Sequence, residues 1–159
     1  MSNPVSRHGR LAGLALVALL ASLGVLGCGD GARRKAQELS QSNLKPLAIL
    51  YGQFASQHRG QPPKTEAEFR AFIKSFKPEQ LAAITGGRDA DGLFVSTRDQ
   101  KPYVVIYGRT AKGPPGPAGA PVVVYEQEGR GGKRFVANSL GAVEELDEAT
   151  FKQRVPDAK

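Results

Sequence analysis

Residues 121–139, "PVVVYEQEGRGGKRFVANS", decide the fold of this chain because they predict a β-hairpin. Two runs rich in β-branched and aromatic residues flank the turn residues 128–133, and this arrangement is typical of paired antiparallel strands. Similar runs at 93–97 and 102–108 predict a second hairpin upstream. We therefore expect an antiparallel sheet of three to four strands, with one face packed on helices.

Helical periodicity precedes the strands. Large apolar residues recur at spacings of three and four from Leu47 to Phe54, which predicts an amphipathic helix over 43–59. Ser42 or Asn43 is placed to cap that helix, and both alternatives fit the residue preferences of a helix start.

A second helix is predicted over 65–76. Thr65 and Glu68 form the pattern of a capping box, and Phe69, Phe72, Ile73 and Phe76 follow on one face. We interpret this row as part of the core rather than as a partner-binding face, since a small domain has few other large side chains to bury. A further helical turn is expected over 78–84, ended by glycines.

The chain closes with a strand over 143–146 and a short helix capped by Asp147. The fold class that these patterns predict is α+β, with N-terminal amphipathic helices packed on a three- to four-stranded antiparallel sheet and a short C-terminal helix. We expect one such domain over 42–159.

The first 27 residues predict an export signal. Arg7 and Arg10 precede an apolar run over 11–27 that contains no acidic residue, which is the order of a secretory signal peptide. Its length and its glycines favour cleavage over a retained transmembrane helix. Without this segment the chain keeps 20 basic and 15 acidic residues, a formal charge of +5.

The residues that end this run, Val25, Leu26, Gly27 and Cys28, resemble the bacterial lipobox. The resemblance implies cleavage between Gly27 and Cys28, a diacylglycerol thioether on the thiol of Cys28, and acylation of the new N-terminus, for example by palmitate. Several acyl chains would hold the protein on a membrane. Because Cys28 is the chain's single cysteine, it cannot form an intramolecular disulfide, and no pattern of His and Asn accompanies it as in a thiol enzyme.

Residues 28–41 are predicted to be a polar tether between the anchor and the domain. Arg33, Arg34 and Lys35 lie close to the predicted lipid attachment, where they are candidates for contact with anionic headgroups. A solvated linker is the alternative interpretation of the same three residues. Nucleic-acid binding is not expected, because the basic residues form no stripe and no stacking platform accompanies them.

Residues suited to catalysis or to metal binding are sparse. His58 is the single histidine after the signal, and it stands near a predicted helix end, where solvation or capping is its expected role. Asp89 and Asp91 have the alternating spacing of a calcium loop but lack its closing glutamate, so they are weak candidates for a metal site and a turn is favoured. Glu126 and Glu128 fit either an acid pair or charges on an exposed sheet edge, and we favour the edge. No catalytic residue and no cofactor is predicted.

Two segments resemble pseudopilin-like proteins of planctomycete-type bacteria, which are related to type II secretion pseudopilins. The first segment is 42–63, "SNLKPLAILYGQFASQHRGQPP", and the second is 134–151, "RFVANSLGAVEELDEATF". The matching positions of the first segment are Asn43, Leu44, Lys45, Leu47, Leu50, Tyr51, Gly60, Pro62 and Pro63. The resemblance implies a pilin-type head. The long apolar N-terminal helix of a true pseudopilin has no counterpart after Cys28, which argues against filament assembly.

These observations predict a lipid-anchored lipoprotein of the bacterial cell envelope whose domain faces the periplasm or the cell exterior. We expect a non-enzymatic binding or structural module, with the membrane and an envelope protein as partners. The alternatives are an accessory component of a type II secretion or pilus-like system and a small envelope hydrolase.

Overall fold

The structure, a computed structural model, describes residues 29–158. The predicted signal peptide, the cleavage position at Gly27 and the lipidation position Cys28 lie outside the described residues. The chain divides into two units, Met1–Arg34 and Lys35–Lys159, and the second contains the folded domain.

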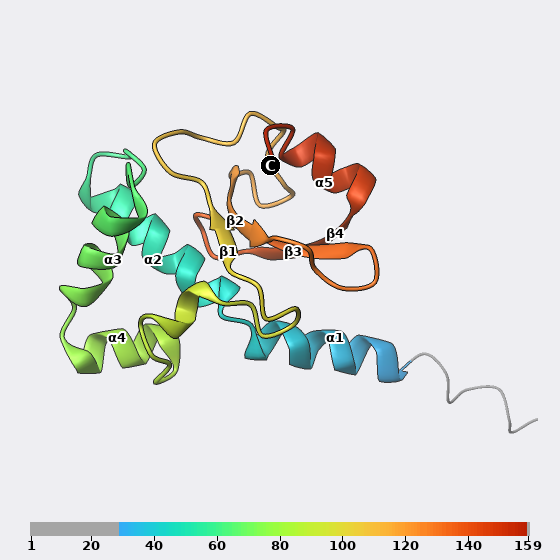
Figure 1. The fold of residues 1–159 in the computed structure, drawn as a ribbon, viewed down its shortest axis with the longest axis horizontal. Helices are drawn as coiled ribbons and strands as arrows, with labels where there is room; N and C mark the ends of the chain where they lie inside the picture. The colour runs from blue at the N-terminus through green and yellow to red at the C-terminus, as the bar shows by residue number, and fades with distance from the viewer. Residues whose placement is uncertain (1–28, 159) are drawn as a thin grey trace, which may run out of the picture. The chain divides into compact units, whose positions relative to one another are not determined.

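The described residues form an α+β fold, as the sequence predicts (Figure 1). The helices are α1 (Gly29–Gln41), α2 (Leu44–Gln57), α3 (Glu66–Lys74), α4 (Pro78–Thr85) and α5 (Glu148–Arg154). The strands are β1 (Tyr103–Val105), β2 (Val122–Glu126), β3 (Lys133–Asn138) and β4 (Val143–Asp147), and a 3₁₀ turn, η1, spans Gly92–Phe94.

The four strands form one antiparallel sheet in the order β1-β2-β3-β4. The hairpin predicted from residues 121–139 is its centre, because β2 and β3 pair directly. The connection between them turns through Gly129, Gly131 and Gly132, which have positive φ angles that favour glycine.

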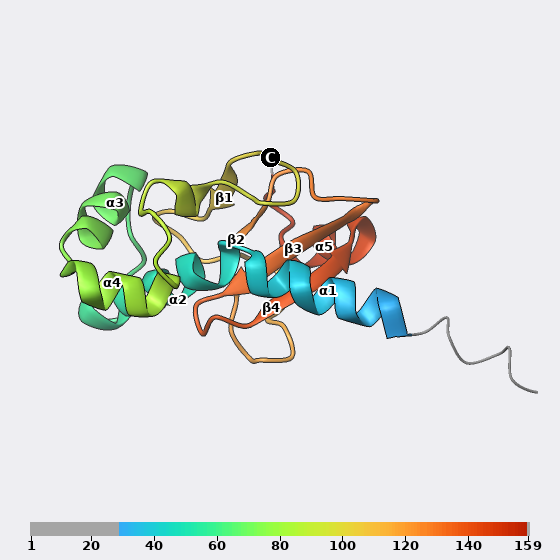
Figure 2. The ribbon, with the colours of Figure 1, turned by 90° about the horizontal axis from the view of Figure 1, so that it is seen from below.

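Helices cover both faces of this sheet. Figure 2 shows α2 and α5 on opposite sides of the sheet. Side chains of β3 alternate between the faces: Phe135 and Ala137 pack in the core under α2, whereas Val136 packs in the core under α5. All five residues of β2 are buried, because helices cover both faces of this strand as well. The sheet therefore forms the middle layer of the domain, and both of its central strands lie in the interior.

Helix α2 lies close against the sheet. A Cβ atom at Gly52 would overlap the carbonyl oxygen of Ser139, so glycine is the residue that allows this approach. The Tyr51 hydroxyl donates a hydrogen bond of 2.7 Å to the carbonyl oxygen of Ile106, and burial raises the pKa of Tyr51 to about 12. Both contacts fix α2 at the same end of the sheet, where β1 and β3 end.

Helices α3 and α4 form in the predicted segments, although α3 ends at Lys74, two residues before the predicted end at 76. The Thr65 hydroxyl accepts the backbone N–H of Glu68 at the start of α3, and Gly86 ends α4 in the left-handed conformation. Phe69 and Ile73 are buried in the core, and Phe72 and Phe76 pack against it. This bears out the interpretation of that row as core.

The strand predicted over 93–97 is wrong in its first half. Leu93 and Phe94 belong to η1 and are both buried, whereas neighbouring residues of a strand would point to opposite faces. The side-chain amide of Asn43 donates to the carbonyl oxygens of Gly92 and Val95, which lie at the start of η1 and just after its end. A single bridge between Val95 and Pro102 remains of the predicted hairpin.

The segment predicted as a polar tether is helical over Gly29–Gln41. Leu39 packs against the core under α2, and the Lys35 ammonium lies 3.0 Å from the Glu145 carboxylate on β4. The sequence pattern did not predict this helix. Leu39 is the one residue of α1 that packs against the core, so the helix has no apolar stripe that a sequence pattern could reveal.

Candidate functional site

The three basic residues proposed for headgroup contact differ in their surroundings. Arg33 and Arg34 are exposed on α1. Lys35 is half-exposed, and its ammonium forms the ion pair with Glu145. Lys35 therefore contributes to the fold as well as to the basic character of this helix.

Asp89 and Asp91 do not converge on a common point. Asp89 Oδ2 accepts the backbone N–H groups of Asp91 and Gly92, which closes the turn before η1. The Asp91 carboxylate lies 3.0 Å from Arg70 and 3.5 Å from Lys74. No cluster of three or more His, Cys, Asp or Glu side chains suited to a metal occurs among residues 29–158.

The interpretation of Glu126 as an edge charge is wrong. Glu126 lies on β2, a central strand, and its exposed fraction is 0%. Glu128 lies beyond the end of the strand, is exposed, and is 3.7 Å from the Lys101 ammonium. The acid pair is not formed either, because one carboxylate is in the core and the other is in solvent.

Glu126 belongs instead to a buried cluster around Arg98. The Arg98 side chain is 4% exposed, and its guanidinium stacks on the Phe135 ring at 3.8 Å from the centroid. Its Nε lies 3.5 Å from Glu126 Oε1, and its Nη1 lies 3.1 Å from Glu145 Oε1. Glu38 of α1 completes the cluster at 3.9 Å from Nη1.

The register of the sheet brings these side chains together. Glu126 pairs with Tyr103 on one side, and Phe135 pairs with Glu145 on the other. Glu126 Oε2 accepts the backbone N–H of Phe135 at 2.8 Å, so the two pairs form one row across the sheet. Arg98 lies over this row, between its two carboxylates.

Neutral groups donate the hydrogen bonds that Glu126 accepts. The Ser96 hydroxyl donates to Glu126 Oε1 at 3.1 Å and accepts the backbone N–H of Arg98 at 3.1 Å. Asp99 holds the same turn, because its carboxylate accepts the N–H groups of Lys101 and Gly129. Asp99 thus links this turn to the β2–β3 connection.

The pKa values of Glu126 and Glu145 are shifted in opposite directions. Burial raises the pKa of Glu126, although the N–H of Phe135 and the charge of Arg98 oppose it. Burial acts to raise the pKa of Glu145 as well, but Lys35 and Arg98 outweigh it and the pKa of Glu145 is lowered. Glu145 therefore stabilises the fold in its charged form.

We expect the Glu145→Gln variant to lose less stability in acid than the wild type. A lowered pKa contributes stability that is present above the unfolded pKa of a glutamate, about 4.3, and is lost as the pH falls through the folded value. Urea unfolding at intervals from neutral pH down to about pH 3 measures this slope. Glu128→Gln is the control for removing one negative charge, and parallel curves for wild type and Glu145→Gln would contradict the assignment.

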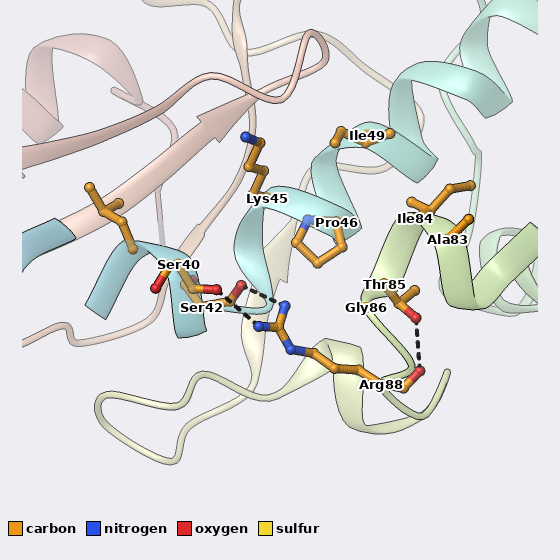
Figure 3. Close-up of a pocket in the computed structure, with 11 residues that line it drawn as sticks. Ser40, Ser42, Lys45, Pro46, Ile49, Ala83, Ile84, Thr85, Gly86 and Arg88 are labelled. Carbon is orange, nitrogen blue, oxygen red and sulfur yellow. Dashed lines mark hydrogen bonds between the residues drawn. The ribbon is translucent and has the colours of Figure 1, made fainter. Parts of the chain in front are cut away.

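A groove between α2 and α4 is a candidate for ligand binding. Its volume is about 420 Å³. Figure 3 shows Lys45, Pro46 and Ile49 along α2, opposite Ala83 and Ile84 at the end of α4. The remaining residues of its lining are Leu39, Ser40, Ser42, Thr85, Gly86 and Arg88.

The charged groups of this groove are cations. The Arg88 guanidinium donates to the carbonyl oxygens of Ser40, at 3.0 Å, and Ser42, at 3.3 Å, which satisfies carbonyl groups at the C-terminal end of α1 (Figure 3). Lys45 is exposed and forms no ion pair within the described part of the chain. No acidic side chain lines the groove.

Sequence reasoning missed both the cluster and the groove. A glutamate that ends the run "VVVYE" is the one local signal for the cluster, since a carboxylate in an otherwise buried strand requires a partner. Nothing local marks Arg98, which the sequence places in a turn. The groove depends on how α2 and α4 pack, and no sequence pattern contains that information.

Within residues 29–158, no helix has both the length and the apolar composition needed to cross a bilayer. Comparison of the chain with protein-family models, with curated proteins and with solved structures finds no match.

Proposed function

We propose that this protein is a lipid-anchored envelope lipoprotein whose α+β domain acts as a non-enzymatic binding module. The observation that carries the proposal is the groove between α2 and α4. It is open, its walls are mostly apolar and its charged groups are cations, which suits recognition of a ligand rather than acid–base catalysis.

The position of the acidic residues also supports a binding role over the hydrolase alternative. Glu126, the carboxylate with the raised pKa, is fully buried and is bonded to Ser96 and to the Phe135 N–H. A general acid must come within hydrogen-bond reach of its substrate. Arg98 and Glu126 are closed to solvent, with side-chain exposures of 4% and 1%, so this pair serves the fold.

The anchor rests on the lipobox resemblance of Val25–Cys28, and the exposed basic residues of α1 follow it directly. Acyl chains supply the membrane affinity in this proposal, and Arg33 and Arg34 add attraction to anionic headgroups. The accessory role in a type II secretion or pilus-like system rests on the residue resemblance alone and stays a prediction.

The anchor is tested by changing its attachment residue. We expect the Cys28→Ser variant, expressed in a bacterium, to lose incorporation of radiolabelled palmitate and to accumulate with its N-terminal segment uncleaved. Detection of label and of mobility on a gel measures both effects. Ser22→Ala is the matched control, because it alters the apolar run and leaves Val25–Cys28 intact. Normal labelling of the Cys28→Ser variant would exclude a lipid at this position.

A further inference from the structure

An apolar side chain is held outward on the turn between β3 and β4. Leu140 is 70% exposed. The turn beneath it is rigid, because Asn138 Oδ1 accepts the backbone N–H groups of both Leu140 and Ala142, and the N–H of Gly141 donates to the Asn138 carbonyl oxygen. An exposed leucine does not stabilise the fold. Because the turn already holds its backbone in place, Leu140 would lose little conformational entropy when a partner covers it.

This turn adjoins the groove. A Cβ atom at Gly141 would lie 2.7 Å from Cγ1 of Ile49, so the turn packs directly on the Ile49 side chain. Ile49 also lines the groove. The turn that carries Leu140 and the groove therefore share the Ile49 side chain, and we call these residues together the docking face: Leu140, Ile49, Pro46, Ile84, Lys45 and Arg88.

The charge of the docking face is unbalanced. Lys45 lies one helical turn before Ile49 on α2, so both belong to the same side of the helix. Neither Lys45 nor Arg88 has a carboxylate partner among the described residues; the bonds of Arg88 go to carbonyl oxygens. Cations without counter-charges at the border of an apolar surface complement a ligand that carries both a carboxylate and apolar side chains.

We propose that the docking face binds an acidic, apolar peptide segment of a partner protein in the envelope. This inference rests on the binding function proposed above and names its ligand class. A volume of about 420 Å³ is in the range of about 300–1,000 Å³ for pockets that hold small ligands. The groove and the protruding Leu140 are complementary to the side chains of a peptide. The flat surface of a bilayer would not fill the groove.

The probe is an array of synthetic 12-residue peptides in which Asp and Glu content and Leu and Phe content vary independently. We expect the full-length protein in detergent to select peptides that contain both kinds of residue. The affinity of the best peptide, measured by fluorescence anisotropy, should fall on the order of tenfold for Lys45→Glu and for Leu140→Ser, and should weaken with added salt. Lys64→Glu makes the same charge change at an exposed lysine outside the groove and should bind as wild type.

Three results would overturn the proposal: no peptide of the array binds, a neutral apolar analogue binds equally well, or Lys45→Glu keeps full affinity. Binding to vesicles of anionic phospholipid that is lost in the Lys45→Glu variant, without peptide binding, would assign the face to the membrane instead. Equal thermal unfolding midpoints for the variants exclude misfolding as the cause. Loss of peptide binding leaves the palmitate result unchanged, so failure here is distinct from failure of the anchor.

Discussion

The Arg98→Met variant is expected to lower the free energy of unfolding by about 3–5 kcal/mol. Methionine fills part of the space over the Phe135 ring but leaves Glu126, with an exposed fraction of 0%, without its nearest cation. Removal of one member of a buried ion pair costs more than the pair contributes, because the remaining charge stays out of water. Glu145 keeps Lys35, so the loss falls mainly on Glu126.

Urea unfolding followed by circular dichroism measures this change. Arg130→Met is the matched control: Arg130 is 66% exposed and lies 3.4 Å from Glu38, and its loss should cost less than about 1 kcal/mol. In the double variant Arg98→Met with Glu126→Gln, the cost should be smaller than the sum of the two single changes, since position 126 then carries no charge that needs Arg98. A double variant with fully additive losses would show that the two side chains are not coupled.

The Gly52→Ala variant is expected to lose about 3 kcal/mol of stability, although alanine favours helices over glycine by about 1 kcal/mol. The loss arises because the new Cβ would overlap the Ser139 carbonyl oxygen, a backbone atom that can move away only if the β3–β4 turn moves as a whole. That turn also packs on Ile49 through Gly141, so its displacement would open this contact as well.

Thermal unfolding of Gly52→Ala and of Gly31→Ala provides the comparison. Gly31 also lies in a helix, but a Cβ there would meet nothing within 4 Å. The Gly31→Ala variant should therefore be as stable as the wild type or slightly more stable. If both variants are stabilised, the close approach of α2 to the turn is not tight in solution.

Local patterns in the sequence were sufficient for most elements of the fold. The spacing of apolar residues predicted α2 and α3, and the capping residue Thr65 predicted the start of α3. The turn residues 128–133 predicted the central hairpin. The prediction failed for the first half of 93–97, where the amide of Asn43, some fifty residues earlier, bonds the carbonyl groups of Gly92 and Val95 on either side of the 3₁₀ turn. It failed for α1 because the ion pair of Lys35 with Glu145 is a contact between distant residues.

The candidate sites were less predictable than the fold. Glu126 and Glu128 are two positions apart, and an alternating strand would present them on one side, but the strand ends at Glu126 and their surroundings differ completely. Strand β2 pairs with β1 on one side and with β3 on the other. Glu126, which we expected at a sheet edge, is therefore in the interior of the sheet, and the sequence does not show this before the strand order is known. Residue type alone therefore cannot separate a solvated carboxylate from a buried one.

The row of Tyr103, Glu126, Phe135 and Glu145 has a consequence for how the sheet assembles. A slip of β2 against β3 by one residue would exchange the faces of the strand, so Glu126 would leave Arg98 and enter the layer beneath α5. Valines alone would tolerate such a slip, since they suit either face. The contacts of Glu126 with Arg98, Ser96 and the Phe135 N–H therefore favour the native register over the slipped one.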